Sequence, residues 1–137
     1  MTLPYGSILA ATVAQFIFGA IWYTPVFGKL WGKIHGFEAH SKVEQQKMMK
    51  AMLPMLGVQF VMTIVTSIVL AVFIQMSDLN PYLLAGLFWL GFVVPTQVSA
   101  VIFGGTPGQW VLHKIAIMAF GALGCFELAV FVLTVLT

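Results

Sequence analysis

Glu127 and His113 lie inside a long apolar stretch toward the end of the chain, and they are the first candidates for chemistry. An ionised side chain at the centre of a membrane-spanning helix costs about 2.5–3.5 kcal/mol, so such a residue is a functional candidate. A separation of 14 residues puts the two on one helix face, about 21 Å apart along the axis. They could mark the ends of one polar track that carries protons or meets a cation. Alternatively, Glu127 only joins helices through hydrogen bonds.

Other polar side chains recur at helical spacing in apolar stretches. Thr96 and Gln97 follow Pro95, whose missing N–H frees a carbonyl one turn earlier for these side chains to satisfy. Interrupted helices of this kind occur in transporter binding sites and also as plain kinks. Two further polar or small stripes are Thr12, Gln15, Gly19 and Trp22, and Gln59, Thr63 and Thr66. We expect the stripes to face a common axis, which is either a dry core or a hydrated path.

Composition indicates which solvent surrounds these residues. The chain has 137 residues, 61% hydrophobic and 7% charged, with a mean hydropathy of +1.02. Soluble domains are about 25% charged because their surface must be wetted. Six basic and four acidic residues cannot cover a globule of this size, so we expect lipid around it. There is no Arg and the lysines are clustered, so the net charge of +2 does not indicate nucleic-acid binding.

Four stretches are suited to membrane-spanning helices: residues 3–24, 52–76, 81–103 and 108–136. At about 1.5 Å per residue, each can cross a hydrocarbon core of about 30 Å. Strands would alternate apolar and polar residues, and these stretches do not. The predicted fold class is therefore an all-α membrane protein with one four-span domain over residues 1–137. The first stretch lacks a basic start and ends in Trp22-Tyr23, so we expect a retained span and not a cleaved signal.

Capping patterns predict where the helices begin. Ser41-x-x-Glu44 is a capping box, so a helix should start at Lys42 and run into the second span, bent or restarted near Pro54. A capping side chain stands before a proline at Asn80-Pro81 and at Thr106-Pro107, which predicts two more helix starts.

The segment 26–50 between the first two spans has an amphipathic pattern. Its apolar residues Phe27, Leu30, Trp31 and Ile34 recur at helical spacing, with Lys29 and Lys33 on another face. We expect a short cytoplasmic interfacial helix with its apolar face in the lipid. Aromatic and lysine side chains favour the membrane surface. The predicted lipid contacts are thus Trp22, Tyr23, Trp31, Lys29, Lys33 and Lys114.

Lysine placement predicts the orientation. Five of the six lysines lie between the first two spans, and Lys114 lies beside the turn into the fourth span, on the same side. The opposite side offers only Asp78. Because basic segments stay in the cytoplasm, both termini should lie outside, on the periplasmic side of a bacterial inner membrane.

A motif at the end of the first span resembles a known family. It reads Gly19-x-x-Trp22-Tyr23-Thr24-Pro25-x-Phe27-Gly28-x-x-Trp31-x-x-x-x-Gly36. It is similar to the opening of the bacterial membrane family known as "domain of unknown function 1761", whose members have similar length. The stretch that begins with Gly91-Phe92-Val93-Val94-Pro95-Thr96 and runs through Phe103 to Leu112 also resembles that family's third and fourth spans. The resemblance implies architecture. It implies no mechanism and no catalytic residue, because the family has no assigned activity.

Metal binding and catalysis find little support. Met48, Met52, Met55 and Met62 lie near one helix face, but methionine is an ordinary packing residue and no Cys or His joins them. The single Cys125 excludes a multi-cysteine site. We see no nucleophile–base set, phosphate loop or carboxylate pair, so we expect no metal, no cofactor and no enzymatic activity. The small-residue pairs Gly121-x-x-x-Cys125 and Gly124-x-x-x-Leu128 predict close helix packing or oligomerisation.

Two functions stay nearly level at this point. A small oligomeric transporter or channel would use Glu127, Gln97 and His113. A non-catalytic subunit or organiser of a larger membrane complex would use the small-residue faces and the aromatic exterior. A weaker third hypothesis is a lipid- or quinone-binding module with Trp22 and Tyr23 at its mouth. The expected partners are membrane lipid and either a homo-oligomer or a larger complex.

Overall fold

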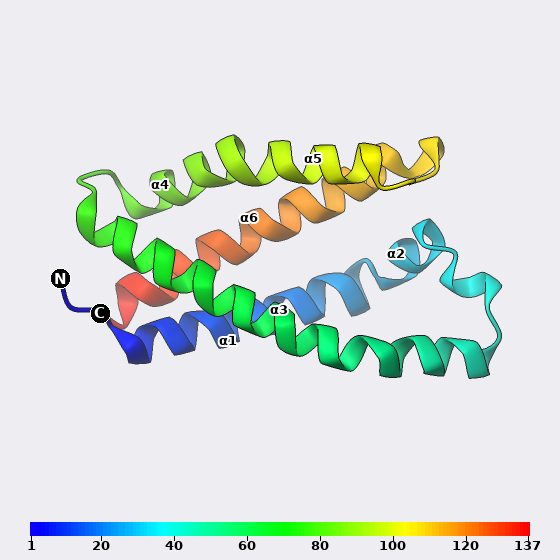
Figure 1. The fold of residues 1–137 in the computed structure, drawn as a ribbon. Coiled ribbons are helices and arrows are strands. Elements are labelled where there is room, and N and C mark those ends of the chain that lie inside the picture. The colour runs from blue at the N-terminus through cyan, green and yellow to red at the C-terminus, as the bar shows by residue number, and fades with distance from the viewer.

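The computed structural model describes residues 1–137, and its regular elements are all helical (Figure 1). Four segments are long and apolar enough to cross a membrane: Tyr5–Val26, Lys42–Met76, Pro81–Phe103 and Gly108–Val135. The expected all-helical chain with four such segments is confirmed. Consecutive segments run antiparallel, so both termini lie at one end of the bundle, here called the terminal end (Figure 1). The opposite end carries all six lysines and is called the lysine end.

The first segment widens before it ends. α1 (Tyr5–Ile21) continues into a π-helical turn (Trp22–Val26) that contains Pro25. Proline has no N–H to donate, and a wider turn accommodates the missing bond. The Phe27 N–H then reaches the Trp22 carbonyl, five residues back, at 3.0 Å. The chain can therefore leave the first span and turn without an irregular loop.

A short helix, α2 (Gly28–Ile34), forms where the amphipathic pattern predicted one. Its last residue, Ile34, is only 5% exposed, so this part of the apolar face packs against protein. Lys29 and Lys33 are exposed. Contact of the remaining apolar face with lipid stays a prediction.

The second segment is one continuous helix, α3 (Lys42–Met76). It passes through Pro54, so the restart that we considered at this proline does not occur. Residues 46–59 are all exposed, which leaves about 21 Å of helix clear of the rest of the chain (Figure 1). Toward the terminal end, Leu70 and Ala71 are buried. Only the second half of α3 therefore belongs to the bundle.

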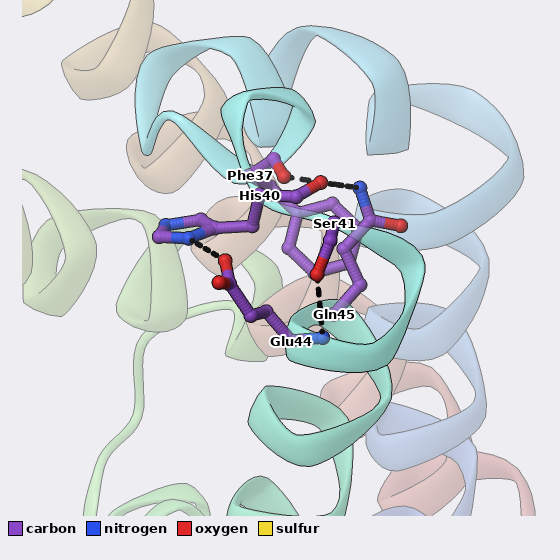
Figure 2. A network of polar contacts seen from close by, with 5 residues as sticks. All are labelled: Phe37, His40, Ser41, Glu44 and Gln45. Carbon is purple, nitrogen blue, oxygen red and sulfur yellow. Dashed lines mark hydrogen bonds and ion pairs between the residues drawn. The ribbon is translucent and has the colours of Figure 1, made fainter.

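A small polar network fixes the start of α3 (Figure 2). The Glu44 N–H donates to Ser41 Oγ at 3.2 Å, which confirms the predicted N-cap. The Glu44 carboxylate does not complete a capping box, because it pairs with His40 Nδ1 at 2.9 Å. Gln45 Nε2 donates to the carbonyls of Phe37 and His40 at 3.1 and 3.2 Å. The turn that follows α2 is thus tied to the first turn of α3.

The third segment contains a second π-helical turn. α4 (Pro81–Phe88), the turn (Trp89–Val93) and α5 (Val94–Phe103) follow one another without a loop. The widening again comes next to a proline, here Pro95. Thr96 Oγ1 donates to the Phe92 carbonyl, one turn before Thr96, at 2.5 Å. The carbonyl that Pro95 leaves free is that of Gly91, so satisfaction of that carbonyl by Thr96 or Gln97 stays a prediction. The interruption at mid-span is therefore a widened helical turn and not a break in the helix.

The two predicted Xaa-Pro helix starts have different outcomes. Asn80 Oδ1 accepts a hydrogen bond from the Tyr82 N–H at 2.9 Å and caps α4 as predicted. α6 (Val111–Val135) is preceded by a 3-10 turn (Gly108–Trp110), and Thr106 Oγ1 has no hydrogen-bond partner. The prediction that Thr106 caps this helix was wrong, because the helical turn begins one residue later than expected.

α6 lies between α1 and the α4–α5 pair. Two glycines of α6 let α1 approach closely: a Cβ at Gly121 would lie 2.7 Å from Trp22 Nε1, and one at Gly124 would clash with the Phe18 ring. The predicted small-residue contact therefore packs helices of the same chain. The apolar core lies toward the terminal end and comprises Ile8, Ala11, Leu70, Ala71, Ala85, Ala129, Val130 and Leu133.

Candidate functional site

The most buried polar residues join α1 to α3. Gln15 Nε2 donates to Ser67 Oγ at 2.8 Å and to the Ala11 carbonyl at 3.2 Å. Thr12 Oγ1 lies 3.0 Å from Ser67 Oγ, and the Ser67 hydroxyl lies 3.0 Å from the Thr63 carbonyl. Thr12 and Ser67 are fully buried, and Gln15 is 4% exposed. These groups satisfy one another inside the bundle, so this part of the polar stripes is a dry, hydrogen-bonded core.

The two sequence stripes contribute unequally to this network. Thr12 and Gln15 of the first stripe and Thr63 of the second face the core. Gln59 lies one turn earlier on α3 and is exposed. Sequence reasoning missed Ser67, the residue that links the two helices. Its signal was the spacing of four from Thr63, which continues the small, polar face of α3 toward Ala71.

Two tryptophans hold α6 from opposite sides. The Trp22 indole N–H donates to the Ile117 carbonyl at 2.9 Å, and the Trp89 indole N–H donates to the Ala119 carbonyl at 2.6 Å. The predicted lipid contact of Trp22 is untested. The only donor of its side chain, however, is used within the protein. Trp89 was not selected from the sequence, because a tryptophan in an apolar span gives no sign of which helix it meets.

Glu127 lies on α6 where α4 passes. A Cβ at Gly86 would be 3.7 Å from Glu127 Oε1, an ordinary contact distance, so α4 passes close to the carboxyl group without requiring glycine there. Oε2 is enclosed by protein atoms and has no hydrogen-bond partner. The ion pair found in the chain joins His40 and Glu44, so Glu127 has no charged partner. Oε2 is therefore an unsatisfied acceptor inside the bundle.

Gln97 and His113 lie elsewhere in the fold. Gln97 Oε1, on α5, is enclosed and also lacks a partner. His113 is exposed, with its ring 5.3 Å from that of Trp110. No hydrogen bond joins Gln97, His113 or Glu127 to one another. Of the predicted site residues, the structure thus joins Gln15 to Ser67 on α3. It leaves Glu127, His113 and Gln97 apart from that network and from one another.

At the lysine end, aromatic rings organise the predicted lipid contacts. The Tyr23 ring meets that of Trp31 edge-on at 4.9 Å, and Lys114 Nζ lies 5.7 Å from the Trp31 ring centroid. Lys114 is thereby held beside α2, although it belongs to α6. Such a cation–π contact contributes roughly 0.5–1 kcal/mol when exposed. Contact of these side chains with lipid stays a prediction.

The polar side chains described above offer hydrogen bonds and charge. No three His, Cys, Asp or Glu side chains come together in the chain. Cys125 is unpaired, and its thiol lies 3.7 Å from the Gln15 carbonyl. The dry α1–α3 network holds helices together. The enclosed Glu127 Oε2 has no partner within the chain, and the Gln59 amide is exposed.

These features define a class: an all-helical protein whose four long segments are apolar enough to cross a membrane. Comparison with known families gives the narrower assignment. Residues 7–133 match the family "Protein of unknown function (DUF1761)", so the chain belongs to that family. The family resemblance inferred from the first-span motif is confirmed. No curated protein and no solved structure matches the chain.

Proposed function

We propose that the protein is a membrane-embedded assembly module, which associates with a second copy through the free half of α3 and carries no solute between its own helices. The observation that carries this proposal is that every residue from 46 to 59 is exposed, although the same helix packs into the bundle further along, at Leu70 and Ala71. In lipid, apolar surface by itself does not drive helices together, so the side chains that this stretch carries favour a partner, and its exposure alone does not.

That face is built from one amide and a row of thioethers. Gln59 is exposed, and the surrounding side chains at helical spacing are 38–64% exposed: Met48, Met52, Met55 and Met62. Methionine adapts its shape to a partner surface, which suits an interface better than it suits plain lipid exposure. This interpretation gives the methionine stripe a role that does not require metal.

A second copy is the occupant that the chemistry of Gln59 favours. The side-chain amide has both a donor and an acceptor, so two copies related by a two-fold axis can satisfy each other. Copies of one membrane protein share the same orientation, so their α3 helices would run parallel with both Gln59 residues at the same depth. An unpaired amide in hydrocarbon costs several kcal/mol, and the symmetric pair removes that cost.

The closed α1–α3 network supports an assembly role over transport within one chain. A hydrated path needs polar groups that face water along the whole span. Here Gln15, Thr12 and Ser67 satisfy one another and are at most 4% exposed. The chain also has no second carboxylate or cation beside Glu127.

Single-molecule photobleaching of labelled protein in liposomes tests the proposal, with Gln59→Leu as the variant. Interhelical hydrogen bonds in membranes contribute about 0.6–2 kcal/mol, so we expect the dimer to weaken about threefold to thirtyfold. Val58→Leu is the matched control, because Val58 is 58% exposed on the same free stretch but points about 100° away. A parent protein that stays monomeric at all protein-to-lipid ratios would contradict the proposal, as would equal dimerisation of Gln59→Leu and parent.

Proton or cation transport is a second candidate, favoured by the enclosed and unpartnered Oε2 of Glu127. A pH-sensitive dye inside liposomes distinguishes the two functions. The assembly module should give no flux above that of empty liposomes, with or without Glu127→Gln. Flux in the parent that Glu127→Gln abolishes would establish transport instead.

A further inference from the structure

A pocket at the lysine end lies between the end of α2 and the turn that joins α5 to α6. Its volume is about 430 Å³, within the range of about 300–1,000 Å³ that is usual for small-ligand sites. Two lysines from different helices line it, Lys33 of α2 and Lys114 of α6, together with His35 and Trp110. Residues that lie 81 positions apart thus supply the two positive charges (114 − 33).

The α5–α6 turn supplies donors without partners. Gly105 has a left-handed φ of +74°, and a Cβ at Gly104 would lie 2.5 Å from the Ala100 carbonyl oxygen, so the turn depends on both glycines. The N–H groups of Gly105 and Thr106 donate to no backbone carbonyl. Thr106 Oγ1, which failed to cap α6, is enclosed and has no partner either. Consecutive free amides in such a turn form a concavity that suits an anion.

The charges around the pocket have one sign. None of the four acidic residues of the chain lines it. Lys114 is held in place over the Trp31 ring, and His35 Nδ1 lies 2.8 Å from the Trp31 carbonyl. A carbonyl only accepts, so Nδ1 carries the proton and Nε2 is left for another group. Trp31 therefore positions two of the pocket's polar side chains.

We propose that this pocket binds a phosphate group. Two ammonium groups, free backbone amides and a hydroxyl are the donors that recognise phosphate oxygens, and charge-assisted hydrogen bonds are the strong ones. A lipid headgroup and inorganic phosphate share this chemistry, so the experiment has an arm for each. The site does not rest on the proposed assembly, because the free stretch of α3 does not line the pocket.

Native mass spectrometry of the detergent-solubilised protein provides the test. The probes are short-chain phosphatidylglycerol and phosphatidylcholine in one arm and inorganic phosphate in the other. We expect the Lys33→Gln/Lys114→Gln variant to bind the preferred probe at least tenfold more weakly. The control is Lys47→Gln/Lys50→Gln, which removes the same charge from α3 and should bind like the parent. Thr106→Val should also weaken binding.

Each outcome decides the matter. Retention of phosphatidylglycerol or phosphatidylcholine, which both carry a phosphate, supports the site with a headgroup as ligand if it is lost only in the Lys33/Lys114 variant. Saturable binding of inorganic phosphate with the same variant dependence supports the site with a soluble ligand. Equal loss in both lysine variants would mean that only net charge acts, and it would overturn the proposal. Absence of binding to all three probes would overturn it as well.

Discussion

The indole of Trp22 occupies the space that any side chain at position 121 would need. A Cβ built on Gly121 would lie 2.7 Å from Trp22 Nε1, and that same N–H donates to the Ile117 carbonyl one turn earlier at 2.9 Å. Glycine and tryptophan therefore act as one unit: the glycine opens the surface of α6, and the tryptophan fills the opening and bonds to the exposed backbone. Because Trp22 lies in a π-helical turn, the interlock also fixes the irregular end of the first span.

Gly121→Ala should destabilise the protein by about 1–3 kcal/mol, because the added methyl group overpacks the contact and displaces the indole. Intrinsic helix propensity predicts the opposite sign, since Ala is better than Gly by about 1 kcal/mol in a helix. Unfolding by SDS titration in mixed micelles measures the difference. Gly57→Ala is the control, because a Cβ there meets nothing within 4 Å. Similar shifts for the two variants would refute the interlock.

Ser67→Ala should cost about 1 kcal/mol or more of stability, because it leaves the buried Gln15 amide without one acceptor. Combined with Gln15→Leu, the loss should be smaller than the sum of the two single losses, since the second change removes the unpaired group. The control Thr66→Ala removes a hydroxyl that bonds only to its own helix, at the Met62 carbonyl. Additive losses in the double variant would show that the two residues act independently.

The sequence predicted the number and type of the helices more readily than their contacts. Length and apolar composition suffice for a span, because lipid forces the backbone into a helix. They do not by themselves indicate which face is inside; the polar stripes do so only in part, because Thr12, Gln15 and Thr63 face the core and Gln59 does not. Ser67 and Trp89 were missed for that reason: their partners lie 52 and 30 residues away. Helix caps depend on neighbouring residues only, so the caps at Ser41 and Asn80 could be predicted. The predicted cap at Thr106 was wrong because the helical turn begins one residue later.

Ser41→Ala should fray the start of α3 without unfolding the bundle. The hydroxyl accepts the Glu44 N–H at 3.2 Å, and loss of an N-cap costs about 1 kcal/mol. Hydrogen exchange of the Glu44 and Gln45 amides should accelerate about fivefold, while amides beyond residue 60 keep their parent rates. Glu44→Gln separates the effects, since it keeps the cap and loses the exposed ion pair with His40, which is worth little. Faster exchange in Glu44→Gln than in Ser41→Ala would mean that the ion pair, and not the N-cap, stabilises the start of α3.

The lysine end should face the cytoplasm, because all six lysines gather there while the α3–α4 loop at the terminal end offers only Asp78. Single cysteines introduced in a Cys125→Ser background report the side. Asp78→Cys should react with a membrane-impermeant maleimide in intact bacterial cells, and Gln46→Cys should react only after the membrane is opened. Asp78 and Gln46 are both exposed, so slow labelling at either position would not result from burial. The reverse pattern would invert the topology and would turn the lysine pocket away from the cytoplasmic leaflet, while leaving its phosphate chemistry unchanged.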